Sequence, residues 1–173
     1  MSYGGYQPQP APPGYGAPMG AVYASIGKRI LAHIIDGIFV GLGAIPGLIL
    51  MVVSFVLAAS TADSRGQISG DVGAGALGMV FLSYAVIFLG VIALWLYNCY
   101  LLGRDGATLG KRMMKIKVLD GLGQPLGFGK AFLREIVKHA LGSACFILLL
   151  WPLWDDQKQG LQDKVFGTHV FDA

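Results

Sequence analysis

Charge is scarce in this chain of 173 residues: only 13% of its side chains are Asp, Glu, Lys or Arg, against about 25% in an ordinary soluble domain. Hydrophobic residues make up 54% of the sequence, and the mean hydropathy is +0.61. Residues 37–62, 72–103 and 140–154 contain no charged residue and no His. Because an apolar run of about 18 residues can cross a bilayer, the composition excludes a soluble globule and a free nucleic-acid binder.

Cysteine is scarce as well. Cys99 and Cys145 both lie in apolar stretches, without Cys or His at metal-binding spacing, so we expect neither a disulfide nor a zinc site. Enzyme signatures are also missing: there is no Gly-x-Ser-x-Gly, His-Glu-x-x-His or Cys-x-x-Cys, and the Gly-x-x-x-Gly-Lys of residues 106–111 lacks the spacing of a phosphate loop. We therefore expect no enzyme, no cofactor and no metal.

The long apolar runs predict an all-α membrane protein with three hydrophobic helices, at about residues 30–58, 76–102 and 131–154. The third is short, because its uncharged part has only 15 residues, so it is either a short span or a re-entrant or interfacial helix. Residues 1–22 are rich in Pro, Gly and Tyr and predict a disordered tail. Lys28 and Arg29 before the first span place this tail in the cytoplasm.

Between the second and third apolar runs lies a small cytoplasmic connection that holds eight of the 13 Lys and Arg residues. Residues 115–119 alternate basic and apolar and predict a short strand, and residues 168–171 are a second strand candidate. If the two strands pair, the third segment cannot cross the membrane; if it crosses, the tail is external and the strands are apart. We expect three spans, and the sequence leaves the side of the C-terminal tail open.

Three polar residues form a stripe at the start of the first span. Arg29, His33 and Asp36 fall within about 60° on one helical face. Asp36 needs a partner, and Arg134 and Lys138 are candidate counter-charges on another helix. Asp36 is then either a structural residue tied to a basic partner or, with His33, part of an ion or proton relay.

Two further patterns concern packing and lipid. Gly37, Gly41, Gly43 and Gly47 recur at four-residue spacing, which predicts close helix packing, although flexible glycine around Pro46 explains the pattern equally well. A basic strip follows the second span and is better explained by solvent or anionic lipid headgroups than by a substrate site; it comprises Lys111, Arg112, Lys115 and Lys117. We expect no nucleic-acid partner.

Taken in order, several short motifs resemble the RDD family of small bacterial integral membrane proteins, over about residues 24–171. The matching motifs are Arg29 through Asp36, Thr108-Leu109-Gly110-Lys111, Val118-Leu119-Asp120, Gly123-x-Pro125, Leu133-Arg134, Gln159 through Lys164 and Gly167-Thr168-x-Val170. The family is named for an Arg and two Asp residues, which Arg29, Asp36 and Asp163 match. One departure is Gln162, which stands where the family usually has His.

The resemblance implies a multi-pass protein of the bacterial inner (plasma) membrane, generally without an assigned activity and with ion transport or antiport suggested for some members; it does not imply an enzyme. Polar groups are few in the central thirds of the predicted spans, which favours an accessory or scaffold subunit of a membrane assembly, contacting other membrane proteins or copies of itself. The alternative is a small oligomeric ion or proton transporter that uses Asp36 and His33.

Overall fold

A computed structural model describes residues 22–62, 70–144, 151, 155 and 159–173. The predicted tail lies outside the described residues apart from Val22, as do most of the loop after the first apolar run and most of the predicted third span beyond Ala144. The structure is mostly helical, and its contacts divide it into two units. The apolar unit comprises Gly37–Trp95, and the polar unit comprises the residues before and after it.

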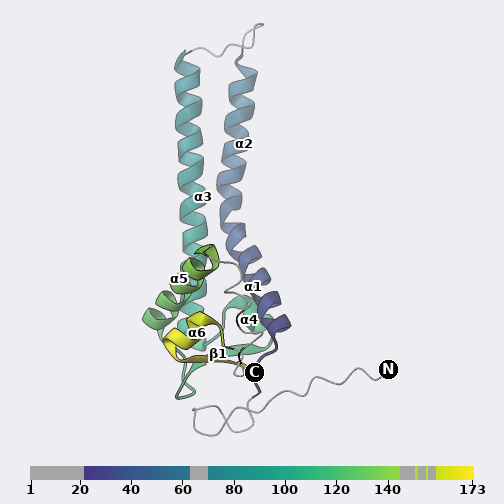
Figure 1. Cartoon of the computed structure of the whole chain (residues 1–173). Helices are drawn as coiled ribbons and strands as arrows, with labels where there is room; N and C mark the ends of the chain where they lie inside the picture. The colour runs from purple at the N-terminus through teal and green to yellow at the C-terminus, as the bar shows by residue number, and fades with distance from the viewer. Residues whose placement is uncertain (1–21, 63–69, 145–150, 152–154, 156–158) are drawn as a thin grey trace, which may run out of the picture. The chain divides into compact units, whose positions relative to one another are not determined.

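Among the described residues, two helical segments are long and apolar enough to cross a membrane, Ile26–Ser60 and Gly73–Asp105. The first is not one regular helix. It consists of α1 (Ile26–Gly41), the 3-10 turn η1 (Leu42–Ala44) and α2 (Ile45–Ser60), shown in Figure 1. Pro46 explains the break, because it has no N–H to donate to the carbonyl four residues earlier and its ring crowds that carbonyl. The second lies within α3 (Gly70–Asp105), which is longer than the predicted 76–102.

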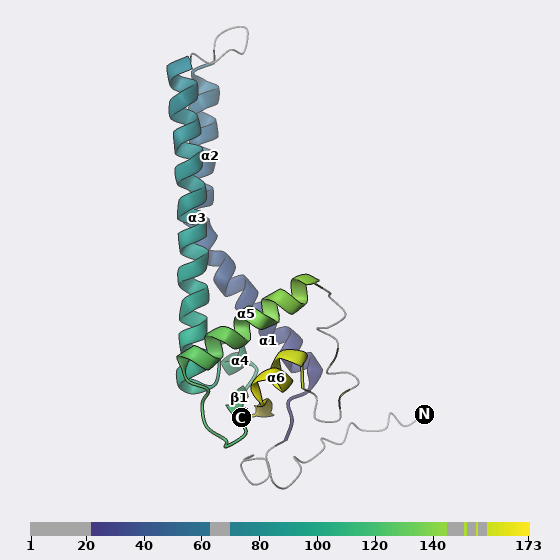
Figure 2. The same ribbon diagram turned by 60° about the vertical axis from the view of Figure 1, so that its left-hand side comes forward.

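Within the apolar unit, α2 and the adjoining part of α3 lie side by side (Figures 1 and 2). A Cβ added to Gly43 would meet the carbonyl oxygen of Gly90 at 2.4 Å, and one added to Gly47 would meet that of Ser83 at 2.6 Å. Gly37 and Gly41 have open space at the Cβ position. Of the four glycines, Gly43 and Gly47 therefore permit the close approach, as small residues do in lipid-embedded helix pairs.

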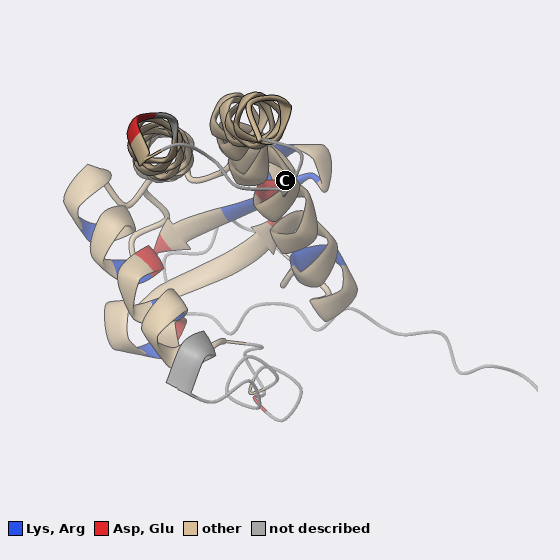
Figure 3. Ribbon diagram, turned by 90° about the horizontal axis from the view of Figure 1, so that it is seen from above, with Lys and Arg blue, Asp and Glu red and all other residues tan. Residues whose placement is uncertain are grey.

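The polar unit contains a two-stranded antiparallel sheet of β1 (Ile116–Asp120) and β2 (Thr168–Asp172), in which Val118 is opposite Val170. Both predicted strands are present, and they pair. Residues 22–24 extend the sheet beside β2 through the Tyr23–Phe171 bridge and the bond from the Ala24 N–H to the Val170 carbonyl. Figure 3 shows the two strands as adjacent, opposed arrows.

Three further helices complete the polar unit: α4 (Leu109–Met113), α5 (Phe128–Ala144) and α6 (Leu161–Phe166). In β1, Ile116 and Val118 are buried while Lys117 is exposed, as the two-residue period of a strand requires. The buried side of β1 joins a small apolar core with side chains from α1, α3 and α5. The core residues are Ala24, Ala32, Leu102, Ile116, Val118, Leu126, Ala131 and Val170.

We predict that Gly43→Ala destabilises the protein by about 1–3 kcal/mol, because the new methyl group would overlap the Gly90 backbone. Gly41→Ala is the matched control: its methyl group meets no atom, and replacing a helical glycine is neutral or mildly stabilising. Thermal unfolding in detergent measures both variants. Equal unfolding temperatures for the two would contradict the close-packed arrangement.

Candidate functional site: a buried ion-pair network

Asp163 is the centre of a buried network in the polar unit and is only 1% exposed. It lies in the first turn of α6, where its Oδ2 accepts a hydrogen bond from the Gly160 N–H at 3.0 Å. Its Oδ1 accepts from the Thr168 hydroxyl at 3.1 Å and from Nε and Nη2 of Arg134 at 3.0 and 2.5 Å. The Arg29 guanidinium lies 3.5 Å from Oδ2. One carboxylate therefore connects α1, α5, α6 and β2.

Arg29 also donates hydrogen bonds to two backbone carbonyls, from Nε to Ala24 at 3.3 Å and from Nη2 to Val170 at 3.2 Å. Its planar guanidinium can contact a carboxylate and carbonyls at the same time, which a lysine ammonium cannot do in the same geometry. Arg29 thus ties the start of α1 to the extended segment before it and to β2. Arg29 and Asp163, far apart in the sequence, therefore form an ion pair.

Glu135 extends the network on α5 and is 6% exposed. Its carboxylate contacts three cations: Arg134 at 2.9 Å, Lys138 one turn further along α5, and Lys111 of α4 at 3.9 Å. Sequence analysis did not single out Glu135. Its position in the predicted third span, next to Arg134, was a signal that it needed buried partners.

Asp36 has a different environment from the one predicted. Its Oδ2 accepts a hydrogen bond from the Thr108 hydroxyl at 2.5 Å, and its Oδ1 accepts from the Gly110 N–H at 2.8 Å. A Cβ at Gly110 would lie 2.2 Å from the Ala32 carbonyl oxygen and 3.0 Å from the Asp36 carboxylate. Thr108 and Gly110 of the Thr-Leu-Gly-Lys motif therefore attach α4 to α1.

Arg134 and Lys138, the candidate counter-charges of Asp36, form ion pairs with other carboxylates. Among the described ion pairs, Arg134 contacts Glu135 and Asp163, and Lys138 contacts Glu135. Among the described ion pairs neither of them contacts Asp36, and each Asp36 oxygen instead accepts a hydrogen bond from a neutral donor at the start of α4. His33 is exposed, and no described hydrogen bond joins it to Asp36.

The network shifts the pKa values of its members. Burial alone would raise the pKa of Asp163 and of Glu135, but the surrounding cations outweigh burial and hold both pKa values below their ordinary range. The stability that these carboxylates contribute is present above about pH 4 and is lost as the pH falls through their lowered pKa values. Burial lowers the pKa of Lys111 to about 8. Since an unfolded Lys binds its proton more tightly, stability should rise between about pH 8 and 10 as Lys111 becomes neutral.

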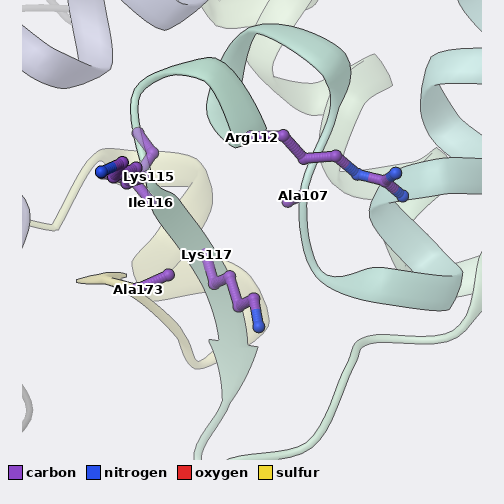
Figure 4. Close-up of a pocket in the computed structure, with 6 residues that line it drawn as sticks. All are labelled: Ala107, Arg112, Lys115, Ile116, Lys117 and Ala173. Carbon is purple, nitrogen blue, oxygen red and sulfur yellow. The ribbon is translucent and has the colours of Figure 1, made fainter.

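The four residues of the basic strip have two different environments in the structure. The Lys111 side chain is only 13% exposed and contacts Glu135, so it does not face lipid or solvent as predicted. Arg112, Lys115 and Lys117 are exposed and border a shallow pocket of about 200 Å³, with Ala107, Ile116 and Ala173. Figure 4 shows the three cationic side chains pointing in different directions. They form a dispersed basic surface, without a point on which they converge.

Three further polar residues, Ser54, Ser83 and Asn98, are buried in α2 and α3. Ser54 and Ser83 donate to carbonyls of their own helices, Leu50 and Met79, each at 2.7 Å. Asn98 is 6% exposed, and its Oδ1 has no described hydrogen-bond partner. In the described part of the chain, no three His, Cys, Asp or Glu side chains gather in a way that suits a metal ion.

These features define a class: a mostly helical membrane protein with two apolar helical segments and a small polar unit held by buried ion pairs. Residues 23–167 match the model of the RDD family, and the chain belongs to that family. Arg29, Asp36 and Asp163, which the sequence resemblance matched to the family's Arg and two Asp residues, each make a buried or partly buried polar contact described above.

Named relatives are bacterial. The chain is 32% identical over 151 residues to the "Proline-rich antigen homolog" of Mycobacterium tuberculosis, which covers 81% of this chain and 59% of the relative. It is 36% identical over 93 residues to the "Proline-rich antigen" of Mycobacterium leprae, covering 53% of this chain and 37% of the relative. The chain thus spans less than two thirds of these relatives. No solved structure matches it.

Asp163→Asn should lower the free energy of unfolding by about 3–5 kcal/mol, because it leaves Arg29 and Arg134 without their shared buried counter-charge. The control is Lys28→Ala, which removes a pair with Asp172 whose side chains are 39% and 36% exposed and should cost less than about 1 kcal/mol. Denaturant unfolding in detergent compares the two. Similar costs would show that the Asp163 network does not hold the polar unit together.

Proposed function

We propose that this protein is a non-enzymatic accessory or scaffold subunit of a membrane assembly, anchored by two spans that present the polar unit at the cytoplasmic surface. The observation that carries the proposal is the distribution of ionisable groups. In the described apolar unit, Asp71 near the start of α3 is the only charged residue, and the serines of both spans bond to their own helices. A pathway for ions would need several polar groups near the middle of the spans.

The proposed topology has two spans across a bacterial inner membrane. Both parts of the polar unit, before the first span and after the second, then lie on the cytoplasmic side. Pairing of β1 with β2 supports it, since both strands must be on one side and the chain between them then returns to that side. The third apolar segment would lie in the interface as a re-entrant or interfacial element. The dispersed cations Arg112, Lys115 and Lys117 would attract anionic headgroups, at about 1 kcal/mol for each cation near the surface.

Cysteine accessibility tests this topology. In a background without Cys99 and Cys145, Leu122→Cys and Val165→Cys place exposed thiols before and after the third apolar segment, at positions 80% and 65% exposed. A membrane-impermeant maleimide should label both only after permeabilisation, whereas Thr61→Cys should label in intact cells. Labelling of Val165→Cys in intact cells, with Leu122→Cys protected, would establish three spans instead.

The alternative is a small oligomeric ion or proton transporter that uses Asp36 and His33. The bonds from Thr108 and Gly110 to Asp36 count against it, because a relay group must exchange its proton or ion during each cycle. We expect proteoliposomes with the wild-type protein and with Asp36→Asn to show the same cation and proton flux as empty vesicles. Flux that is lost in a folded Asp36→Asn variant would establish transport.

Association provides a second test of the proposal. A scaffold subunit should co-elute with defined membrane partners after gentle solubilisation of native membranes, and the same partners should be recovered after cross-linking in intact cells. Elution as a lone homo-oligomer under both conditions would refute the accessory role and leave the topology unaffected.

A further inference from the structure

The helix α5 carries its buried charges on the side that faces the rest of the polar unit. Arg134 forms an ion pair with Asp163 of α6. Glu135 contacts Lys111 of α4 and Lys138 in the next turn of α5. These pairs fix the rotation of α5 about its own axis, because any other rotation would separate buried charges from their partners.

The opposite side of α5 is apolar. At about 100° per residue, five uncharged residues fall within an arc of about 100° on that side. This apolar face of α5 comprises Gly129, Leu133, Ile136, Val137 and Ala140. Leu133 is 53% exposed and Ile136 is 41% exposed. A surface helix of a soluble protein has the reverse arrangement, with its apolar side buried and its charges in water.

The start of α5 lies beside the end of the second apolar helical segment, as Figure 2 shows for α5 and the last turns of α3. The Gly127 N–H donates to the Gly103 carbonyl at 3.0 Å, and a Cβ at Gly103 would meet the Phe128 backbone at 2.7 Å. One turn earlier in α3, Tyr100 is exposed, and the Arg104 guanidinium lies over its ring, 5.4 Å from the centroid. Exposed Tyr and Arg at the end of a span are typical of the headgroup level of a bilayer, so α5 begins at that level.

We infer that the apolar face of α5 lies in the cytoplasmic leaflet, with the helix parallel to the membrane surface, and contacts acyl chains just below the phospholipid headgroups. The inference rests on the proposed function, which places the polar unit at the cytoplasmic surface, and it adds the partner of α5. The ion pairs of Arg134 and Glu135 hold this part of α5 in the polar unit, so it does not cross the bilayer. Lys130 is exposed about 60° from Leu133, at the edge of the apolar face, where its ammonium can reach anionic headgroups.

Lipid fits the apolar face of α5 better than a second copy of the chain does. Only Leu133 and Ile136 of this face are large apolar side chains in the exposed class. A stable protein–protein interface buries about 1,200–2,000 Å² in total, which two such side chains do not supply. An interfacial helix needs only a shallow apolar face with cations at its edge.

The experiment measures the depth of single nitroxide labels on the full chain in vesicles of phosphatidylcholine and phosphatidylglycerol. In a background without Cys99 and Cys145, Leu133→Cys and Ile136→Cys carry the label on the apolar face of α5. Collisions of each label with oxygen, which partitions into acyl chains, are compared with collisions with a nickel chelate that remains in water.

Three other positions calibrate the measurement. Phe81→Cys, at a residue of α3 that is 75% exposed, is the reference for acyl chains. Leu122→Cys, at an exposed residue after β1, is the reference for water. Lys130→Cys lies on the same helix as the test positions but at the edge of the apolar face. All labels replace exposed side chains, and thermal unfolding of each labelled protein in detergent checks that the fold is kept.

We expect the labels at Leu133 and Ile136 to lie about 5–10 Å into the boundary between headgroups and acyl chains, shallower than the label at Phe81. The label at Lys130 should lie nearer the headgroups, and the label at Leu122 should collide mainly with the nickel chelate. Depth along α5 should therefore follow the rotation of the helix, because the helix lies in the plane of the membrane.

Each contrary outcome has a distinct meaning. Nickel collisions at Leu133 and Ile136 as frequent as at Leu122 would overturn the inference and leave the accessory role, which co-elution tests, unaffected. Depth that increases steadily from Lys130 to Ile136 would show a spanning α5 and overturn the two-span topology as well. Spin–spin broadening at Leu133 that disappears on dilution with unlabelled protein, without oxygen collisions, would assign the face to a second copy and overturn the inference.

Discussion

The polar unit depends on one buried carboxylate. Asp163 accepts hydrogen bonds from Gly160, Thr168 and Arg134 and forms an ion pair with Arg29, so α1, α5, α6 and β2 meet at two oxygen atoms. A buried ion pair stabilises little by itself, since desolvation offsets most of the attraction, but loss of one partner leaves a buried charge unmatched. The network therefore contributes more to the specificity of the fold than to its stability, because a fold that separated these residues would bury unpaired charge.

The two units are held by different interactions. In the apolar unit, the exposed faces carry large apolar side chains such as Phe55 and Phe81, and close contact between α2 and α3 depends on glycine at positions 43 and 90. In the polar unit, the apolar core is small, and hydrogen bonds and ion pairs supply the remaining constraints. This difference follows from the surroundings, because burial of apolar groups gives no driving force between helices that lie in lipid.

Sequence analysis predicted much of the fold for physical reasons that act locally. Apolar runs predicted three hydrophobic helices, of which two are candidate spans among the described residues, and the alternation of basic and apolar residues predicted β1, whose end is fixed by Asp120 accepting from the backbone of Leu122 and Gln124. Arg29 and Asp36 were found as exceptions in a charge-poor chain, and Asp163 was found through the family resemblance. The partners of Asp36 were not, because a hydroxyl and a backbone N–H 72 and 74 residues away leave no signal in periodicity or charge.

The sequence by itself determined the class of protein, two of the three predicted apolar helices and the two strands, since each is set by composition or by spacing along one element. Only the tertiary structure decided which polar residues meet: Lys111 turns toward Glu135, Arg134 toward Asp163, and Asp36 toward α4. The physical reason is that charge alone does not choose a partner, because each cation in this region could neutralise Asp36, Glu135 or Asp163. Packing of β1 against β2, and of α4 against α1 through Gly110, selects one of these pairings.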